Sequence, residues 1–256
     1  MRGAINASTI FGTIVMARQG SSSLILVIEG DDDHFLIDSH VNDGDVILIG
    51  GNGRPKLLEA AEKAERRGIR GGRFLVDVDY DRFARPTDQF PANVIASKHH
   101  DAVMDLIMAN IGLLDRVIDS HSRSARRRGV QFDTPAAREA AFELAATVAP
   151  LRIVNERAGH NRTLKKFPFG DLPSSSPTAI ELAQAAIKRS ATTVTDVDLA
   201  AQITAEHSHL GLDKAVLVGD HDLFRALSRV LREYGVTAVA DSMWTAFLPG
   251  VMCAEL

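Results

Sequence analysis

The chain has 256 residues, of which 45% are hydrophobic and 24% charged, and a formal net charge of −4. These values are typical of a soluble globular protein, and the apolar runs fall far short of the about 18 residues that a membrane helix needs. The negative charge argues against a protein that coats nucleic acid nonspecifically, and the single cysteine, Cys253, excludes an intramolecular disulfide or a multi-cysteine zinc site. We therefore expect a cytoplasmic protein without a membrane span.

Short β-branched runs alternate with helical patterns in the first half of the chain, which is typical of βαβ units and a parallel sheet. Strands are predicted at 24–30 (LILVIEG), 45–51 (DVILIGG), 73–81 (RFLVDVDYD) and 93–97 (NVIAS). Helices are predicted at 31–41 and at 55–68, the second opened by Pro55 and closed by Gly68. The expected fold class is α/β, with a Rossmann-like domain.

Acidic residues stand where two of these strands end. Glu29 ends the first predicted strand, and Asp77, Asp79 and Asp81 end the third. Side chains alternate along a strand, so Asp77 and Asp79 are expected to project from the same side, with Asp81 following if the strand continues. The carboxyl ends of parallel strands lie along one rim, where crowded carboxylates repel one another unless a cation lies between them. The pattern therefore predicts a Mg²⁺ or Mn²⁺ site and phosphate chemistry.

Structural interpretations of the same acids remain open. Asp31, Asp32 and Asp33 open a helix, where acidic side chains cap free N–H groups. Glu29 and Asp77 could instead form salt bridges with nearby arginines. The candidates for such a bridge are Arg54, Arg70 and Arg73.

Two basic segments could hold phosphates, although each could equally be a solvated surface. Arg126 and Arg127 lie in the run HSRSARRR at 121–128, and Lys165 and Lys166 lie in HNRTLKKFPF at 160–169, where phenylalanines follow them. The Gly-rich segment GGNGRPK at 50–56 could cradle a phosphate or simply form a tight turn, and it lacks the spacing of a nucleotide-hydrolysing loop.

The second half of the chain is rich in helical patterns. Helices are predicted within 134–150, where the helix stops before Pro150, and at 176–190 and 195–211. A further helix is predicted to run through Glu233. The apolar run KAVLVG at 214–219 predicts a buried strand that could rejoin the first sheet. We therefore expect an α/β domain at 1–118 with an N-terminal helix, and a mainly helical region at 119–256.

An apolar strand that ends in Glu-Gly, with Asp33 four positions after Glu29 and a later strand that ends in Asp77-x-Asp79, resembles the toprim domain. That domain is shared by topoisomerases, bacterial primases, small RNA-maturation nucleases and the overcoming-lysogenization-defect nucleases. The resemblance covers about residues 22 to 115.

A closer resemblance is to standalone bacterial toprim-like nucleases, a group that includes the effector subunit of the PARIS anti-phage defence system. The segments that carry it are VIEGDDD, GGNGRPK, DVDYD, NVIASK and HHD (99–101), and LVGDHDLFRAL (217–227) resembles a late Gly-x-His-Asp-Leu element. The chain departs from the group at Val103, where relatives often carry an acid.

This resemblance implies a metal-dependent nuclease that cleaves DNA or RNA, with tRNA among the candidate substrates, and a role in anti-phage defence. It also implies regulation by an ATPase partner, and homodimerisation follows by analogy. Glu29 would be the general acid/base or a metal ligand, Asp77 and Asp79 would be magnesium ligands, and Asp33 and Asp81 would complete a second metal position.

Two alternatives belong to other functional classes. The chain could be a non-catalytic binding or regulatory subunit of a larger defence complex. It could also be a phosphatase of the haloacid-dehalogenase type, because FLVDVDYD resembles a nucleophile strand and VGDHD a late acidic loop, although Glu29 and Gly30 would then have no role.

Overall fold

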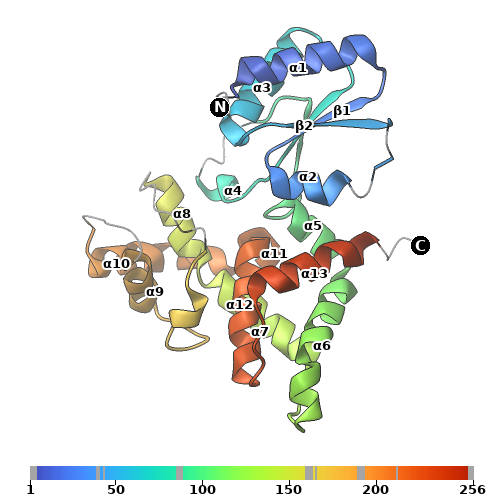
Figure 1. Cartoon of the computed structure of the whole chain (residues 1–256). Helices are drawn as coiled ribbons and strands as arrows, with labels where there is room; N and C mark the ends of the chain where they lie inside the picture. The colour runs from blue at the N-terminus through green and yellow to red at the C-terminus, as the bar shows by residue number, and fades with distance from the viewer. Residues whose placement is uncertain are drawn as a thin grey trace. The chain divides into compact units, whose positions relative to one another are not determined.

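The computed structural model describes residues 5–252 apart from 39–40, 43, 85–88, 159–163, 165, 189–193 and 212. The chain divides into two compact units (Figure 1). The first unit consists of residues 1–78 and 87–98, and the second of residues 79–86 and 99–256.

The first unit is built on a four-stranded, all-parallel sheet, which confirms the expected α/β class. Its strands are β1 (Leu24–Ile28), β2 (Val46–Gly50), β3 (Gly72–Val76) and β4 (Val94–Ala96). Its helices are α1 (Ala7–Gly20), α2 (Asp31–Asp38) and α3 (Arg54–Arg66). Figure 1 shows α1 and α3 over one face of the sheet and α2 over the other.

The core of the first unit lies between the sheet and the pair α1 and α3. Alternate residues of β1 and β3, among them Ile25, Val27 and Phe74, are fully buried against apolar side chains of the two helices, such as Ile14 and Leu57. Every second residue of a strand faces the same side, so this alternation is what fixes one face of the sheet onto the helices.

The strand order is β2-β1-β3-β4, so the chain starts near the middle of the sheet and builds outward in both directions. The helix that follows β1 and the helix that follows β2 therefore lie on opposite faces, as Figure 1 shows for α2 and α3. The chain adds β2 on one side of β1 and then β3 on the other side, so the strand order reverses between β1 and β3. Ligands of open α/β sheets bind beyond the carboxyl ends of the strands at such a reversal.

Strand β3 is shorter than predicted, because it ends at Val76 rather than at Asp81. Beyond that point the Val78 N–H donates to the Ser97 hydroxyl at 2.9 Å, and Asp79 adopts a left-handed conformation with φ of 47°. A left-handed residue cannot continue a strand, so the strand alternation expected for Asp77, Asp79 and Asp81 is wrong.

The second unit is helical in its described residues. Its first half contains α4 (Asp81–Ala84), α5 (Ala102–Ala109), α6 (Ile111–Arg127), α7 (Thr134–Ala146), α8 (Ala149–Arg157) and the 3₁₀ turn η1 (Phe169–Asp171). Its second half contains α9 (Ala179–Ile187), α10 (Asp196–Ala205), the 3₁₀ turn η2 (Glu206–Gly211), α11 (Lys214–Leu217), α12 (Asp220–Glu233) and α13 (Ala240–Met252). Helix α12 packs against α7 and α13 through an apolar face that includes Leu223, Leu227 and Leu231.

One local prediction in the second unit is wrong. The run at 214–219 forms the short helix α11, not a strand, and it does not join the sheet. The Asp213 side chain accepts a hydrogen bond from the Ala215 N–H at 3.0 Å and so starts a helix there. The helix predicted to stop before Pro150 does so, because α7 ends at Ala146. Pro150 itself lies in the first turn of α8, where proline needs no N–H partner.

No helix within the described ranges has both the length and the apolar character required to cross a membrane.

Candidate functional site

Glu29 follows β1 and Asp77 follows β3, the two neighbouring strands between which the strand order reverses. Strands β1 and β3 are hydrogen-bonded neighbours, so both residues leave the sheet at the same edge. The Asp77 N–H donates to Glu29 Oε1 at 3.2 Å, which joins the two acidic segments directly. Both side chains are half-buried. This edge therefore carries two carboxylates with access to solvent at the position where α/β sheets bind ligands.

The Gly-rich loop after β2 packs against the end of β1. The Gly51 N–H donates to the Ile28 carbonyl at 2.6 Å, and the Gly53 N–H donates to the Glu29 carbonyl at 3.1 Å. A Cβ at Gly51 would lie 2.9 Å from the Ile28 oxygen, so only glycine allows this approach. Because these two N–H groups are bonded to the protein, the loop supports the Glu29 backbone and does not offer them to a phosphate.

Asp33 stabilises the turn that follows Glu29. Its Oδ2 accepts a hydrogen bond from the Gly30 N–H at 3.0 Å, as an acid at the third position of a helix does when it reaches back to the cap residue. For Asp33, this hydrogen bond supports the interpretation that an acid of the 31–33 run caps the helix. Asp33 is also tied to the backbone immediately beside Glu29.

Asp79 and Asp81 belong to the second unit. The Asp79 N–H donates to the His100 carbonyl at 2.8 Å, and Asp79 Oδ1 lies 3.8 Å from His100 Nδ1. The Asp79 side chain is 50% exposed. Asp81 is half-buried in the first turn of α4, where a carboxylate also favours the helix dipole.

The His100–Asp101 pair meets the Gly219–Asp220 pair, although the two are more than 100 residues apart. The Asp220 N–H donates to Asp101 Oδ2 at 3.0 Å, and the same oxygen lies 3.1 Å from His100 Nδ1. A Cβ at Gly219 would lie 2.9 Å from His100 Cε1. The sequence marked both segments only through the family resemblance, and no local pattern predicts that they touch.

The acids of this cluster are held by many donors. Asp101 caps α5 by accepting from the Met104 N–H at 2.7 Å, and Asp220 Oδ2 accepts from Trp244 Nε1 at 2.5 Å. Asp222 receives two hydrogen bonds of 2.6 Å from the Arg152 guanidinium. Burial favours a lower pKa for Arg152, but the adjacent Asp222 carboxylate outweighs burial and raises the pKa above its usual value. The guanidinium therefore stays charged.

Tyr80 anchors the segment that follows β3 into the second unit. Its hydroxyl donates to the Leu217 carbonyl at 2.9 Å, and its ring packs edge-on against His100. Burial raises the pKa of the Tyr80 phenol far above its usual value, and nearby carboxylates such as Asp222 add to the rise. A protonated, buried phenol whose proton is donated to a carbonyl is poorly suited to act as a nucleophile.

The donor set at these positions suits a hard divalent cation. Glu29, Asp77, Asp79 and Asp81 offer carboxylate oxygens, which Mg²⁺ and Mn²⁺ prefer over nitrogen and sulfur. In the described part of the chain, no group of three or more His, Cys, Asp or Glu side chains gathers closely enough to hold a metal ion. Glu29 and Asp77 lie in the first unit, and Asp79 and Asp81 lie in the second.

The basic residues singled out from the sequence have different surroundings. Arg126 is bound within the protein, since it donates to Asp119 at 2.6 Å and to Thr134 at 2.9 Å and lies over the Phe132 ring. Arg127 is exposed at the end of α6, and Lys166 is exposed beside a cavity. Lys165 lies outside the described residues.

Comparison with known proteins adds no family assignment: no protein-family model matches the chain, and no curated protein matches it significantly.

Proposed function

We propose that this protein is a metal-dependent nuclease of the toprim type that cleaves DNA or RNA phosphodiesters. The observation that carries the proposal is the hydrogen bond between Glu29 Oε1 and the Asp77 N–H at the carboxyl edge of β1 and β3. It joins the Glu-Gly and Asp-x-Asp segments of the toprim pattern at the reversal point of a parallel sheet. The family resemblance of the sequence agrees with this location.

Each residue has a defined role in the proposal. Glu29 takes the proton from the attacking water, and the Asp77 N–H and the Gly-rich loop hold its segment in place. Asp33 fixes the turn after Glu29 through the Gly30 N–H. By the family resemblance, Asp77 and Asp79 would hold the metal, and Asp33 and Asp81 would contribute to a second metal position. A bound Mg²⁺ or Mn²⁺ would supply stabilisation of the charge that develops on the phosphate oxygens.

Metal-dependent cleavage is the direct test. The purified chain is incubated with a panel of single- and double-stranded DNA and RNA, tRNA included, with Mg²⁺, Mn²⁺ or EDTA. We expect metal-dependent cleavage that falls by at least about 100-fold in Glu29→Gln and in Asp77→Asn. Glu59→Gln is the matched control, because Glu59 is an exposed carboxylate on α3 of the same unit and pairs with Lys63 in a surface salt bridge. Folded variants that cleave as fast as the unchanged protein would contradict the proposal.

The resemblance to the anti-phage nucleases extends the proposal to partners. We propose that the chain acts as a defence effector whose activity an ATPase partner controls, and that it can form a homodimer. Co-purification from the native host followed by mass spectrometry tests the partner. Sedimentation of the purified chain tests the dimer. A chain that stays inert with every metal after its partner has been triggered would favour the non-catalytic binding subunit instead.

A further inference from the structure

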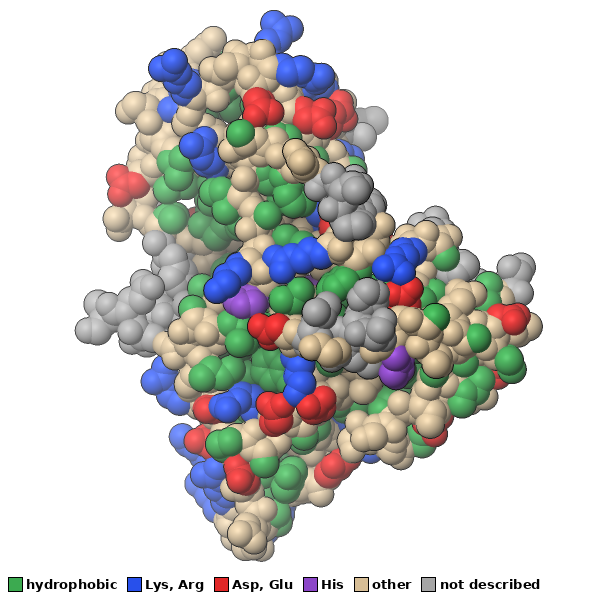
Figure 2. Space-filling model, turned by 180° about the vertical axis from the view of Figure 1, so that it is seen from behind, with side chains coloured by type: hydrophobic (Ala, Val, Ile, Leu, Met, Phe, Trp, Pro, Cys, Tyr) green, Lys and Arg blue, Asp and Glu red, His purple; other side chains and the backbone are tan. Residues whose placement is uncertain are grey.

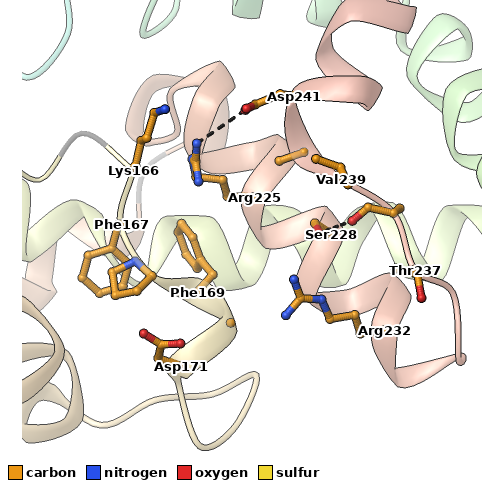
Figure 3. A pocket seen from close by; sticks show the side chains of 14 residues that line it. Lys166, Phe167, Phe169, Asp171, Arg225, Ser228, Arg232, Thr237, Val239 and Asp241 are labelled. Atoms are coloured by element: carbon orange, nitrogen blue, oxygen red, sulfur yellow. Dashed lines mark hydrogen bonds and ion pairs between the residues drawn. The ribbon is translucent and has the colours of Figure 1, made fainter.

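The second unit contains a cavity of about 470 Å³ between the segment 166–171, helix α12 and the start of α13 (Figure 3). Its volume lies in the range of small-molecule sites, about 300–1,000 Å³. Three cationic side chains line it, and they come from two separate segments: Lys166, Arg225 and Arg232. The cavity is far from the carboxylates in the sequence, and nothing in the proposed nuclease reaction uses it.

The two arginines lie on one face of α12. Arg225, Ser228 and Arg232 follow the i, i+3, i+7 spacing that lines one side of a helix, and the two guanidinium groups start about 10 Å apart along the axis. Ser228 donates to the Ala238 carbonyl, which holds the segment before α13 against α12. A Cβ at Gly170 would lie 2.9 Å from Arg232 Nη1, so the guanidinium of Arg232 lies directly against η1. Figure 3 shows both arginines bordering the cavity.

These arginines differ from others in the second unit in how their donors are used. Arg152 and Arg138 each donate to a carboxylate at 2.6 Å or less, and Arg126 bonds to both Asp119 and Thr134. Within the described residues, Arg225 pairs with the mostly exposed Asp241, at 3.5 Å. Among the described residues, no hydrogen bond or ion pair is made by the Arg232 guanidinium, which lies against Gly170. The cavity therefore presents guanidinium donors that are available to an anion.

Lys166 approaches the cavity from the opposite wall, as Figure 3 shows. Its φ is 68°, a left-handed value that is uncommon for a residue with a side chain and favours glycine. A side chain at this position therefore carries a backbone cost that glycine would not. The substitution Lys166→Gly would therefore remove the positive charge and relieve the backbone strain at the same time.

The remaining lining adds two features beyond positive charge. Asp171 places a carboxylate on the lining, separated in Figure 3 from the Arg225–Asp241 pair. Such a carboxylate repels a bare phosphate but accepts hydrogen bonds from sugar hydroxyls. Val239 is 59% exposed and gives the cavity an apolar surface that could contact a base. Phosphate, hydroxyl and base are the three parts of a ribonucleotide.

Charges of both signs mix on the surface of the molecule. On the face of the molecule shown in Figure 2, Lys and Arg side chains are interspersed with Asp and Glu side chains and do not form one continuous basic surface. Together with the net charge of −4, this favours a local pocket over broad coating of a nucleic acid.

We propose that this cavity binds a ribonucleoside phosphate, with the phosphate held by Arg225, Arg232 and Lys166 and a sugar hydroxyl donating to Asp171. The ligand can be a free nucleotide or one nucleotide of an RNA strand, since both present the same groups. The proposal goes beyond the nuclease assignment, because binding here needs neither the metal nor Glu29.

Calorimetric titration of the full chain in EDTA tests the proposal. The probes are the four ribonucleoside 5′-monophosphates, the matching nucleosides and 2′-deoxynucleotides, and an eight-nucleotide single-stranded RNA. We expect at least one monophosphate to bind, and its nucleoside and its 2′-deoxy form to bind at least 10-fold more weakly. Tighter binding of the RNA would identify a strand as the source, and binding of the mononucleotide alone would identify a free nucleotide.

Three variants locate the binding in the cavity. Arg232→Gln and Lys166→Gly should each weaken binding at least 10-fold, and Lys166→Gly should leave the thermal midpoint unchanged or higher because glycine suits the left-handed backbone. Arg229→Gln is the matched control, since Arg229 lies on the same helix, pairs with Glu233 at 3.0 Å and does not line the cavity.

Binding of none of the probes, or equal binding by the two cavity variants and the unchanged protein, would overturn the proposal. Equal binding of the deoxy and ribose forms would overturn the role of Asp171. Glu29→Gln should bind the nucleotide normally, so a failed nuclease assay with intact binding separates this proposal from the catalytic one.

Discussion

Acidic residues gather in two regions of the molecule, and their surroundings differ. At the carboxyl edge of the sheet, Glu29 and Asp77 are half-buried and joined by a hydrogen bond from a backbone N–H. In the helical unit, Asp101, Asp220 and Asp222 are 7%, 8% and 4% exposed and are held by backbone N–H groups, an indole and a guanidinium. A carboxylate can remain that deeply buried only when such donors surround it.

The difference suggests separate tasks for chemically identical groups. The buried acids connect helices α5, α8 and α12 with the indole of α13, so their removal should affect folding first. The half-buried acids at the sheet edge keep access to solvent, which a site that exchanges metal and substrate requires. The following variants test this division, in order of decreasing expected effect on stability.

Removal of Asp222 should have the largest effect. Asp222→Ala leaves the Arg152 guanidinium, which is 18% exposed, without its bidentate carboxylate, and we expect the free energy of unfolding to fall by about 3–5 kcal/mol. Urea denaturation followed by circular dichroism measures it. Asp115→Ala is the comparison, because the Asp115–Arg138 pair is more exposed and its loss should cost clearly less. Similar losses in both variants would show that burial does not distinguish the two pairs.

Two glycines with close neighbours should come next. Gly219→Ala places a Cβ 2.9 Å from the His100 ring, and Gly51→Ala places one 2.9 Å from the Ile28 carbonyl. We expect each to destabilise its unit by about 1–3 kcal/mol. Gly50→Ala is the control for Gly51, because a Cβ there meets no atom within 4 Å. Thermal unfolding compares the three variants, and a control that is destabilised as much as Gly51→Ala would refute the steric explanation.

Tyr80→Phe should have a smaller effect with a distinct pH dependence. At neutral pH it loses the hydrogen bond to the Leu217 carbonyl, which is worth about 1 kcal/mol. The pKa of Tyr80 is raised by burial in the folded state, so the unfolded chain loses the phenol proton first, near its usual value of 10.0. The stability that depends on the protonated phenol is therefore present below about pH 10 and is lost as the pH rises above that value.

Denaturation at pH 8 and at about pH 10.5 measures this dependence, because the two values lie on either side of the usual phenol pKa of about 10. The unchanged protein should lose more stability between the two values than Tyr80→Phe does. Equal losses in both proteins would show that Tyr80 does not ionise on unfolding in this range.

Glu29→Gln and Asp77→Asn should change stability least. Both side chains are half-buried, and both substitutions keep the shape of the side chain, so we expect changes within about 1 kcal/mol. Metal binding should respond instead, with Mn²⁺ affinity at least 10-fold weaker in calorimetric titration. A large loss of stability with unchanged metal affinity would place these residues with the structural acids of the helical unit.

Local patterns predicted the sheet well, because β1, β2 and β3 are apolar runs flanked by clear turn and helix signals. They failed where context decides. The apolar run at 214–219 could form a strand or a buried helix, and the Asp213 cap selects the helix. The acids after Val76 alternate as in a strand, yet Asp79 turns into a left-handed conformation to meet the His100 carbonyl.

The candidate site shows the same limit. The sequence predicted that Glu29 and Asp77 lie at the same edge of the sheet, because acids at the ends of two neighbouring parallel strands share that edge. It could not pair Asp101 with Asp220, which lie 119 positions apart, nor place Lys166 beside Arg225 and Arg232. Those contacts depend on how the helices pack, and no short sequence motif predicts helix packing.

The chain passes between the two units three times, after residues 78, 86 and 98. No single cut can therefore release either unit intact. A truncated gene that begins at residue 99 would lack Tyr80, and the Leu217 carbonyl and the edge of the His100 ring would lose the side chain that covers them. A separately expressed fragment 99–256 should therefore not fold stably unless the octapeptide 79–86 is added to it.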